Sequence, residues 1–179
     1  SDAVVQAIQA LSAPGGAAGD AARPAMVRHT DALADAKRIL GHIEATPDPT
    51  TPRVLGWALR KVMRTVFTGI TVDEPGLERV RALAEAASKG GAPMLLLPSH
   101  RSYMDFLLLS YVFFAYNLPL PYIAAGEDFL GLAKASDLLR RSGAFFIKRS
   151  FRGDVLYSSV LRSYVQSLLM NSQTVEFFI

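Results

Sequence analysis

The sequence contains no cysteine, and that absence excludes several kinds of protein. Its 179 residues hold no disulfide, no thiolate zinc ligand and no cysteine nucleophile. Three common motifs are missing as well: the G-x-S-x-G elbow of serine hydrolases, the G-x-x-x-x-G-K-[ST] phosphate loop and the G-x-G-x-x-G dinucleotide turn. These absences argue against a serine hydrolase, a P-loop enzyme and a dinucleotide-dependent oxidoreductase.

Charge of either sign is modest, and half of the residues are hydrophobic. Lys and Arg number 19 against 16 Asp and Glu, which gives a formal net charge of +3. This length and apolar content suit one domain with a real core, with or without a helical extension, and they exclude disorder for most of the chain. The slight positive charge permits an anionic substrate, a membrane surface or nucleic acid, and it selects none of them.

Residues 1–51 are expected to form an N-terminal region of helix and linker. The first eleven residues show a short helical pattern, residues 12–25 are rich in Ala, Gly and Pro and are expected to be a linker, and residues 26–45 are expected to be a helix. Three prolines in residues 46–53 break any helix there. We therefore place a domain boundary at this point and assign residues 52–179 to one domain.

Residues 54–68 are expected to form an amphipathic helix with a basic face. The apolar residues recur with helical spacing, and Arg60, Lys61 and Arg64 lie opposite them. Two interpretations fit this pattern: a helix that lies on anionic lipid, and a packed helix with a solvated basic face. The second is the more common arrangement, and the sequence favours it.

From residue 76 onward, helical and strand patterns alternate. Strands that alternate with helices are typical of an α/β fold, so we expect a mixed, largely parallel sheet flanked by helices and preceded by the helical N-terminal segment. The expected helices cover residues 76–88, 102–116, 130–142 and 154–170, and the expected strands cover residues 94–98, 121–125, 144–148 and 174–179, of which the first and the last are expected to be buried. The apolar residues expected on the core side of the last helix are Val155, Leu156, Val160, Leu161, Val165, Leu168 and Leu169.

The run from Phe106 to Ala125 is apolar enough to be considered as a membrane span. Pro119 and Pro121 argue against one. The uninterrupted helical part, Phe106 to Tyr116, rises only about 16 Å, whereas the hydrocarbon layer of a bilayer is roughly 30 Å thick. A buried core helix is the better interpretation.

A polar cluster, Ser99 to Asp105, follows the first expected strand. In open α/β sheets, ligands bind at the carboxyl ends of the strands. His100 comes just before a helix and Asp105 falls in its first turn, so the carboxylate can fix one imidazole nitrogen while the other takes a proton from a substrate hydroxyl. A purely structural alternative also fits, because Ser102-x-x-Asp105 matches a helix capping box.

A cationic cluster lies between residues 140 and 152, where five basic residues occur without a carboxylate. Lys148 and Arg149 follow an expected strand, and an unpaired guanidinium at a strand end suits a phosphate group. Arg140 and Arg141 end a helix, where their charge favours the helix dipole. The basic stretch is short, so no nucleic-acid partner is expected.

Three segments resemble the motifs of the glycerolipid acyltransferase family, in the family's order. The segment from His100 to Asp105 resembles its H-x-x-x-x-D motif, and the segment from Gly143 to Arg149 resembles its second motif. The segment from Val175 to Phe178 resembles the approach to the third motif, Glu-Gly-x-Arg-Ser-Arg. The resemblance covers roughly residues 52–179. Because the chain stops inside an apolar run and short of the third motif, we expect it to be a fragment of a longer protein, truncated on its C-terminal side.

This resemblance implies acyl transfer from acyl-CoA to the hydroxyl of a three-carbon phosphate. His100 would be the general base, and Asp105 would orient it. The family uses no metal and no cofactor, since acyl-CoA is a co-substrate, and it forms no acyl-enzyme.

The resemblance also implies which residues contact the substrate. Arg149 would hold the phosphate, and Lys148 stands where the family usually has Arg. Gly143 would let the backbone approach the site, and Arg101 would add positive potential beside the base.

Within the family, residues 123–131 most resemble the branch that acylates dihydroxyacetone phosphate, which yields 1-acyl-glycerone phosphate for ether lipids. The branch that acylates glycerol 3-phosphate is the alternative, and a lipid- or partner-binding module without catalysis is a third. By resemblance the protein is expected at a membrane surface, that of the peroxisome. The mitochondrial outer membrane and a bacterial cytoplasmic membrane are the alternatives, and further protein partners are unknown.

Overall fold

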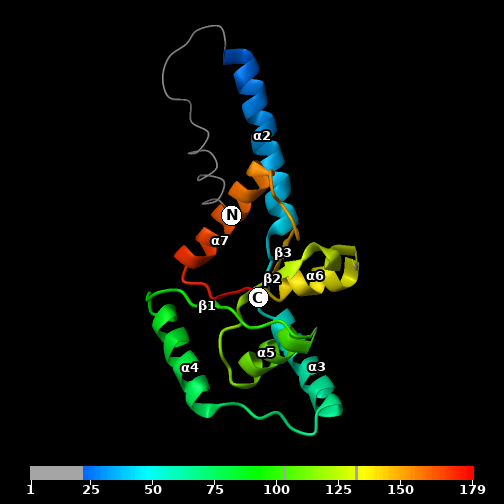
Figure 1. Ribbon diagram of the computed structural model, residues 1–179, viewed down its shortest axis with the longest axis vertical. Helices are drawn as coiled ribbons and strands as arrows, with labels where there is room; N and C mark the ends of the chain where they lie inside the picture. The colour runs from blue at the N-terminus through cyan, green and yellow to red at the C-terminus, as the bar shows by residue number, and fades with distance from the viewer. Residues whose placement is uncertain (1–21, 103, 132) are drawn as a thin grey trace.

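The computed structural model describes residues 22–179 apart from residues 103 and 132. The short helix and most of the linker expected at the N-terminus lie outside the described residues. The described chain folds into an α/β structure, as the sequence predicts (Figure 1). Its helices are α2 (Ala22–Ile43), α3 (Thr51–Val66), α4 (Glu74–Ser88), α5 (Met104–Ala115), α6 (Ala133–Arg141) and α7 (Val155–Met170), with a 3₁₀ helix η1 (Glu127–Gly131). Its strands are β1 (Leu95–Leu96), β2 (Tyr122–Gly126), β3 (Ala144–Ile147) and β4 (Val175–Glu176).

Three helices begin earlier than the sequence pattern indicates. Helix α2 begins at Ala22, so the expectation of a linker is wrong for residues 22–25. Helix α3 includes Pro52 in its first turn, where a missing N–H costs no hydrogen bond. Helix α4 begins at Glu74 because the carboxylate of Asp73 accepts a hydrogen bond from the N–H of Gly76 at 2.9 Å.

The four strands form one sheet in the order β1-β4-β2-β3, and every pair in the described chain is parallel. The last strand of the sequence, β4, therefore lies between β1 and β2. Because all four strands run in one direction, their carboxyl ends meet at one edge of the sheet. That edge is where an α/β sheet binds its ligands.

Strand β1 lies at the border of this sheet, and the expectation that it is buried is wrong. Leu95 and Leu97 are about half exposed, at 50% and 52%. Its pairing with β4 nevertheless extends beyond the two strand residues, because the carbonyl oxygens of Met94 and Pro98 accept hydrogen bonds from β4 and from the residues that follow it.

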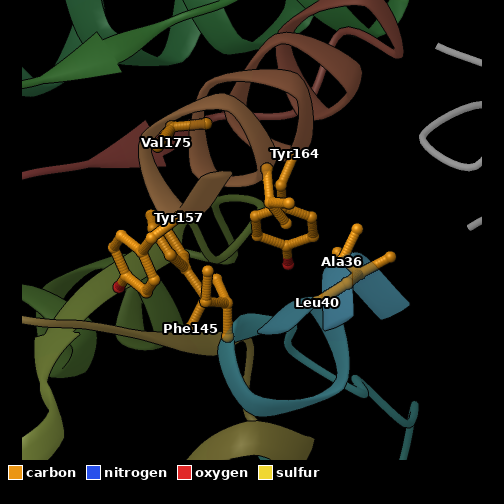
Figure 2. Close-up of a cluster of buried hydrophobic side chains, with 8 residues drawn as sticks. Ala36, Leu40, Phe145, Tyr157, Tyr164 and Val175 are labelled. Atoms are coloured by element: carbon orange, nitrogen blue, oxygen red, sulfur yellow. The ribbon is translucent and has the colours of Figure 1, made fainter. Parts of the chain in front are cut away.

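Helices α2 and α7 pack together on one face of the sheet, away from α3, α4 and α5 (Figure 1). Figure 2 shows the core that they form with the sheet, in which the ring of Phe145 on β3 meets that of Tyr164 edge to face at 5.6 Å. Arg140 ties α6 to the end of α2, because its guanidinium donates hydrogen bonds to the carbonyl oxygens of His42 and Glu44. The buried members of this core are Ala36, Leu40, Ile43, Phe145, Tyr157, Val160, Tyr164 and Val175.

The arrangement of α7 differs from the sequence expectation at three positions. Val155 was expected on the core side, yet it is 76% exposed. Tyr157 and Tyr164, which the apolar pattern did not include, are buried instead. Their rings fill the core, and each hydroxyl accepts a hydrogen bond from a backbone N–H, that of Lys148 and that of Ala45 respectively.

Helices α3, α5 and α6 cover the other face, and α4 packs beside α5 around a second apolar cluster. Helices α3 and α5 approach closely because Gly56 faces the ring of Phe114, where any Cβ would clash. None of the helices in the described ranges is both long and apolar enough to cross a membrane.

Candidate functional site

A cavity of about 400 Å³ opens at the carboxyl edge of the sheet. The residues that follow each strand line it: His100 after β1, Gly126 at the end of β2, Lys148 and Arg149 after β3, and Phe178 after β4. The structure thus places His100 and Arg149 on one edge and around one cavity, as a parallel sheet predicts. A basic ring nitrogen and two cations share this space with aromatic and aliphatic walls.

His100 is held on its backbone side and against one face of its ring. Its N–H donates a hydrogen bond to the carbonyl oxygen of Ile179 at 2.9 Å, and its ring lies 5.3 Å from the ring of Phe178. The side chain keeps 46% of its surface exposed. The residues after β4 therefore position the imidazole at the mouth of the cavity.

Asp105 caps helix α5 and faces His100 with the same oxygen. Its Oδ2 accepts hydrogen bonds from the N–H groups of Arg101 and Ser102, both at 2.6 Å, and lies 3.6 Å from Nδ1 of His100. The hydroxyl of Ser102 accepts a hydrogen bond from the N–H of Met104 at 3.1 Å. The capping box and the His–Asp pair are therefore compatible, because one carboxylate serves both.

The cap also fixes the charge of this carboxylate. The N–H of Ser102, followed by that of Arg101, holds the pKa of Asp105 below its usual value. An ionised carboxylate therefore stands beside Nδ1 of His100 at neutral pH.

Arg149 has a carboxylate partner, and the expectation of an unpaired guanidinium is wrong. Its Nε and Nη2 lie 2.7 and 2.6 Å from Oδ2 of Asp128 in η1. The two side chains are 76% and 58% exposed, so water reaches the pair. The sequence around Arg149 did not show this partner, because only the pairing of β2 with β3 brings Asp128 near.

Lys148 lines the same cavity with a second set of contacts. Its Nζ lies 3.4 Å from Oδ2 of Asp154 and 4.6 Å from the centre of the Tyr157 ring. The N–H of Tyr157, ahead of the contact with Lys148, holds the pKa of Asp154 below its usual value. The segment between β3 and α7 is thus fixed at both ends, and two of its three cations, Lys148 and Arg149, line the cavity.

Three predicted site residues do not line this cavity: Asp105, which stands behind His100, and Gly143 and Arg101. Gly143 is at the amino end of β3, opposite Lys148 and Arg149, with a φ of +101° that favours glycine. A Cβ at this position would also come within 3.3 Å of the carbonyl oxygen of Pro121. Arg101 is exposed, and it contacts Asp105 through its backbone N–H. Neither residue lines the cavity in the described chain.

A smaller apolar cavity of about 50 Å³ continues from the first, between α3 and α5. Leu55, Leu59 and Phe114 contribute to its walls. The sequence analysis did not identify these residues as part of a site. The two cavities share four lining residues, Phe106, Ile123, Leu139 and Ala144.

Glu176 is a buried acid that the sequence interpretation counted within an apolar strand. It is fully buried, and in the part of the chain that the structure describes neither carboxylate oxygen has a hydrogen-bond partner. It pairs with Leu96 and Ile123 across the sheet, so it shares their face. Burial raises the pKa of Glu176 to about 7.

Comparison with known proteins gives consistent matches. A family model described as "Acyltransferase" matches residues 72–179. The chain is 46% identical over 129 residues to the dihydroxyacetone phosphate acyltransferases of Bos taurus and Homo sapiens, which is 71% of this chain and 18% of each relative. It is 38% identical over 150 residues to the mitochondrial glycerol-3-phosphate acyltransferase 1 of Homo sapiens, or 80% of this chain and 18% of that relative. The chain thus spans about a fifth of the length of the curated relatives it matches.

Proposed function

The chain belongs to the acyltransferase family, and from this premise we propose that it transfers an acyl group from acyl-CoA to the hydroxyl of dihydroxyacetone phosphate. The product is 1-acyl-glycerone phosphate. The observation that carries the proposal is the cavity at the carboxyl edge, which joins His100 to two cations across an apolar floor. Transfer of an acyl chain to a phosphorylated alcohol needs those three features together.

His100 acts as the general base. Since its Nδ1 faces Asp105, we assign the proton transfer to Nε2. Nε2 takes the proton of the acceptor hydroxyl, and the oxygen attacks the carbonyl carbon of the thioester. The carbon–sulfur bond then breaks, and the imidazolium returns the proton to the departing CoA thiolate. Asp105 is a positioning residue, whose fixed charge holds the ring and stabilises its protonated form.

Arg149 and Lys148 bind the acceptor phosphate. Both line the cavity that contains His100, and both approach it from the end of β3. The guanidinium supplies a planar pair of donors, and the ammonium adds a point charge. Asp128 has to share or release Arg149 when the phosphate arrives. Arg101 adds positive potential near the base, while Gly143 shapes the turn before β3 and does not contact the substrate.

The acyl chain lies in the apolar part of the cavity. The walls shared by the two cavities lead from His100 toward the space between α3 and α5. A chain that extends along this path leaves its carbonyl carbon near the imidazole and its CoA moiety toward solvent. No metal or cofactor enters the proposed reaction.

The choice of dihydroxyacetone phosphate rests on the higher identity to relatives that carry this acceptor in their name, 46% against 38%. Glycerol 3-phosphate is the second candidate, because the match to the relative named for it covers more of this chain. Among the relatives reported above, the name of the glycerol-3-phosphate acyltransferase includes a location, "mitochondrial". We propose association with a membrane surface, with the peroxisome as the first site to examine.

The test is acyl transfer by the natural protein that contains this chain, in detergent or lipid. Palmitoyl-CoA is the donor, and dihydroxyacetone phosphate and glycerol 3-phosphate are offered separately as acceptors. We expect turnover with dihydroxyacetone phosphate and a loss of at least a hundredfold in His100→Ala, in line with the usual contribution of a general base.

One control variant and two alternative outcomes make this test decisive. His42→Ala removes a histidine at the end of α2, far along the chain from the cavity, and it should keep full activity. Turnover with glycerol 3-phosphate alone would show that this compound, and not dihydroxyacetone phosphate, is the acceptor. If the folded protein turns over neither acceptor, the proposed reaction is wrong and the alternative of a lipid- or partner-binding module is favoured.

A further inference from the structure

The three cations that follow β3 differ in what holds them. Lys148 and Arg149 line the cavity, and each has a carboxylate partner. Arg152 comes three residues after Arg149, outside the cavity walls, and it is exposed. Among the described residues, no acid forms an ion pair with it. A guanidinium of this kind, beside a cavity to which we assign a phosphorylated acceptor, suits a second phosphate group.

The acid closest to Arg152 in the sequence, Asp154, is engaged elsewhere. Its Oδ1 accepts a hydrogen bond from the N–H of Tyr157 at 3.0 Å, and its Oδ2 lies 3.4 Å from Nζ of Lys148. One carboxylate thus serves the start of α7 and the neighbouring cation. Within the part of the chain that the structure describes, the charge of Arg152 is therefore left for an anionic ligand.

Phe151, the residue before Arg152, brings an aromatic ring to the mouth of the cavity. It lines the cavity and is 37% exposed, so it borders both the cavity and the solvent. Its ring lies 5.5 Å from the ring of Tyr157. Tyr157 is buried, and its hydroxyl accepts a hydrogen bond from the N–H of Lys148. A fixed ring therefore supports Phe151 on one side, and its exposed surface can receive a planar ligand.

A tight turn holds Phe151 and Arg152 at adjacent positions of a fixed backbone. The N–H of Asp154 donates a hydrogen bond to the carbonyl oxygen of Phe151 at 3.1 Å. Gly153 completes the turn with a φ of +85°, which glycine adopts without strain. No atom lies within 4 Å of a Cβ built on Gly153, so the backbone conformation and not packing favours glycine here.

We propose that this turn, residues 151–154, binds the nucleotide end of acyl-CoA, with Arg152 on a phosphate group and the ring of Phe151 against the adenine. The inference rests on the proposed acyl transfer and gives the donor a binding site of its own. With the acyl chain in the apolar part of the cavity and the thioester near His100, the rest of the donor leaves through the mouth, where Phe151 lies. An aromatic ring stacks on a base, and a guanidinium pairs with a phosphate.

The acceptor does not need these two residues. A three-carbon phosphate has one phosphate group, for which Lys148 and Arg149 stand on the cavity wall. It has no aromatic part that could stack on a ring. CoA carries an adenine and several phosphate groups at the end remote from its thioester, so of the two substrates only CoA matches a ring beside a cation.

Donors of graded length test the proposal in the natural protein that contains this chain. Palmitoyl-CoA, palmitoyl-3′-dephospho-CoA and S-palmitoyl-pantetheine are compared at saturating acceptor. Arg152→Gln should raise the KM for palmitoyl-CoA by about fivefold or more and leave the KM for S-palmitoyl-pantetheine unchanged, because that donor lacks the nucleotide. If the effect disappears with the dephospho donor, Arg152 binds the 3′-phosphate. If it persists there, Arg152 binds the diphosphate, and either result supports the proposal.

Two further variants test the ring, and one serves as a control. Phe151→Leu should raise the KM for palmitoyl-CoA by about fivefold or more, whereas Phe151→Tyr, which keeps a ring, should retain the natural value. Neither should change the KM for S-palmitoyl-pantetheine. Arg162→Gln on α7 removes another exposed arginine that forms no ion pair in the described residues, and it should leave every KM unchanged.

Binding of CoA itself, measured by calorimetry without turnover, separates this inference from the proposed reaction. The affinity for CoA should be weaker in Arg152→Gln by about fivefold or more. If the protein turns over palmitoyl-CoA while this variant keeps the natural KM and affinity, the inference is wrong and the reaction stands. A loss of CoA affinity in Arg101→Gln in place of Arg152→Gln would put the nucleotide beside α5 and also overturn the inference.

The opposite combination is informative as well. Binding of CoA that depends on Arg152, in a protein that acylates neither acceptor, would support the inference and contradict the proposed reaction. A folded protein that does not bind CoA at all would contradict both.

Discussion

The guanidinium of Arg149 lies against the carboxylate of Asp128, with two of its nitrogens 2.7 and 2.6 Å from Oδ2. The cation that we assign to the acceptor phosphate is therefore engaged by an acid before any substrate arrives. Because both side chains are largely exposed, the pair is weak enough to open for a dianionic phosphate.

Asp128→Asn should strengthen binding of the acceptor. The variant removes the charge that competes for Arg149, and exposed ion pairs contribute at most about 1 kcal/mol, so we expect the acceptor KM to fall by up to about fivefold. Steady-state kinetics with varied acceptor measures this. Asp137→Asn is the control, since it removes the partner of Arg141, 3.1 Å away on the same helix. A KM that rises in Asp128→Asn would show that Asp128 itself contacts the acceptor.

Asp105→Asn should lower kcat much more than Ser102→Ala does. Both variants weaken the cap of α5, at a cost of about 1 kcal/mol in the free energy of unfolding. Only the first removes the charge beside Nδ1 of His100, so its kcat should fall by about a hundredfold. Denaturant unfolding and kcat are measured on both. Equal kcat values in the two folded variants would show that Asp105 only caps helix α5 and does not position His100.

Glu176 should make stability depend on pH. Folding raises its pKa from 4.5 to about 7, so between these values the folded protein keeps a proton that the unfolded chain has released. The stability associated with this proton is complete below about pH 4.5 and is lost as the pH rises through 7. The loss amounts to up to about 3 kcal/mol in the free energy of unfolding.

Glu176→Gln isolates this contribution, because the amide does not ionise. Between pH 5 and pH 8 the natural protein should lose stability relative to the variant, as measured by urea unfolding at each pH. Parallel pH profiles for the two proteins would show that a hydrogen-bond donor or a cation compensates the charge of Glu176.

Gly56→Ala should disturb the contact between α3 and α5. The new Cβ meets the ring of Phe114, which has to shift into the small apolar cavity, at a cost of about 1–3 kcal/mol. Activity with long acyl donors should fall more than activity with short ones, because the shifted ring occupies the end of the acyl path. Gly41→Ala on α2 is the control, since nothing lies within 4 Å of its new Cβ and a helix gains stability from the change.

Much of the fold follows from local patterns. Each expected strand and helix after residue 76 is present, with ends that differ by a few residues, because buried runs alternate with Gly, Pro and capping residues. The exposure of Leu95 and Leu97 did not follow, since the position of β1 at the border depends on the order of strands. The burial of Tyr157 and Tyr164 was missed because the apolar pattern treats tyrosine as polar, although its ring can fill a core.

The positions of the candidate site residues followed from the sequence more than their pairings did. His100, Lys148 and Arg149 were placed after expected strands and Asp105 in the first turn of a helix, and the parallel sheet brings His100 and the two cations to one cavity. The partner of Arg149 was not identified, because Asp128 is 21 residues away and comes near only through the pairing of β2 with β3. The burial of Glu176 was hidden by the apolar residues on both sides of it.

The place of β4 in the sheet has a consequence for the way this protein is made. Among the described residues β1 pairs with β4 alone, and β4 follows it in the sequence after β2 and β3. During synthesis, β1 therefore waits without a partner while about 80 further residues leave the ribosome. The nascent chain exposes the apolar segment around Leu95 and Leu97 throughout that interval, so it is at this stage that a chaperone would have most to protect.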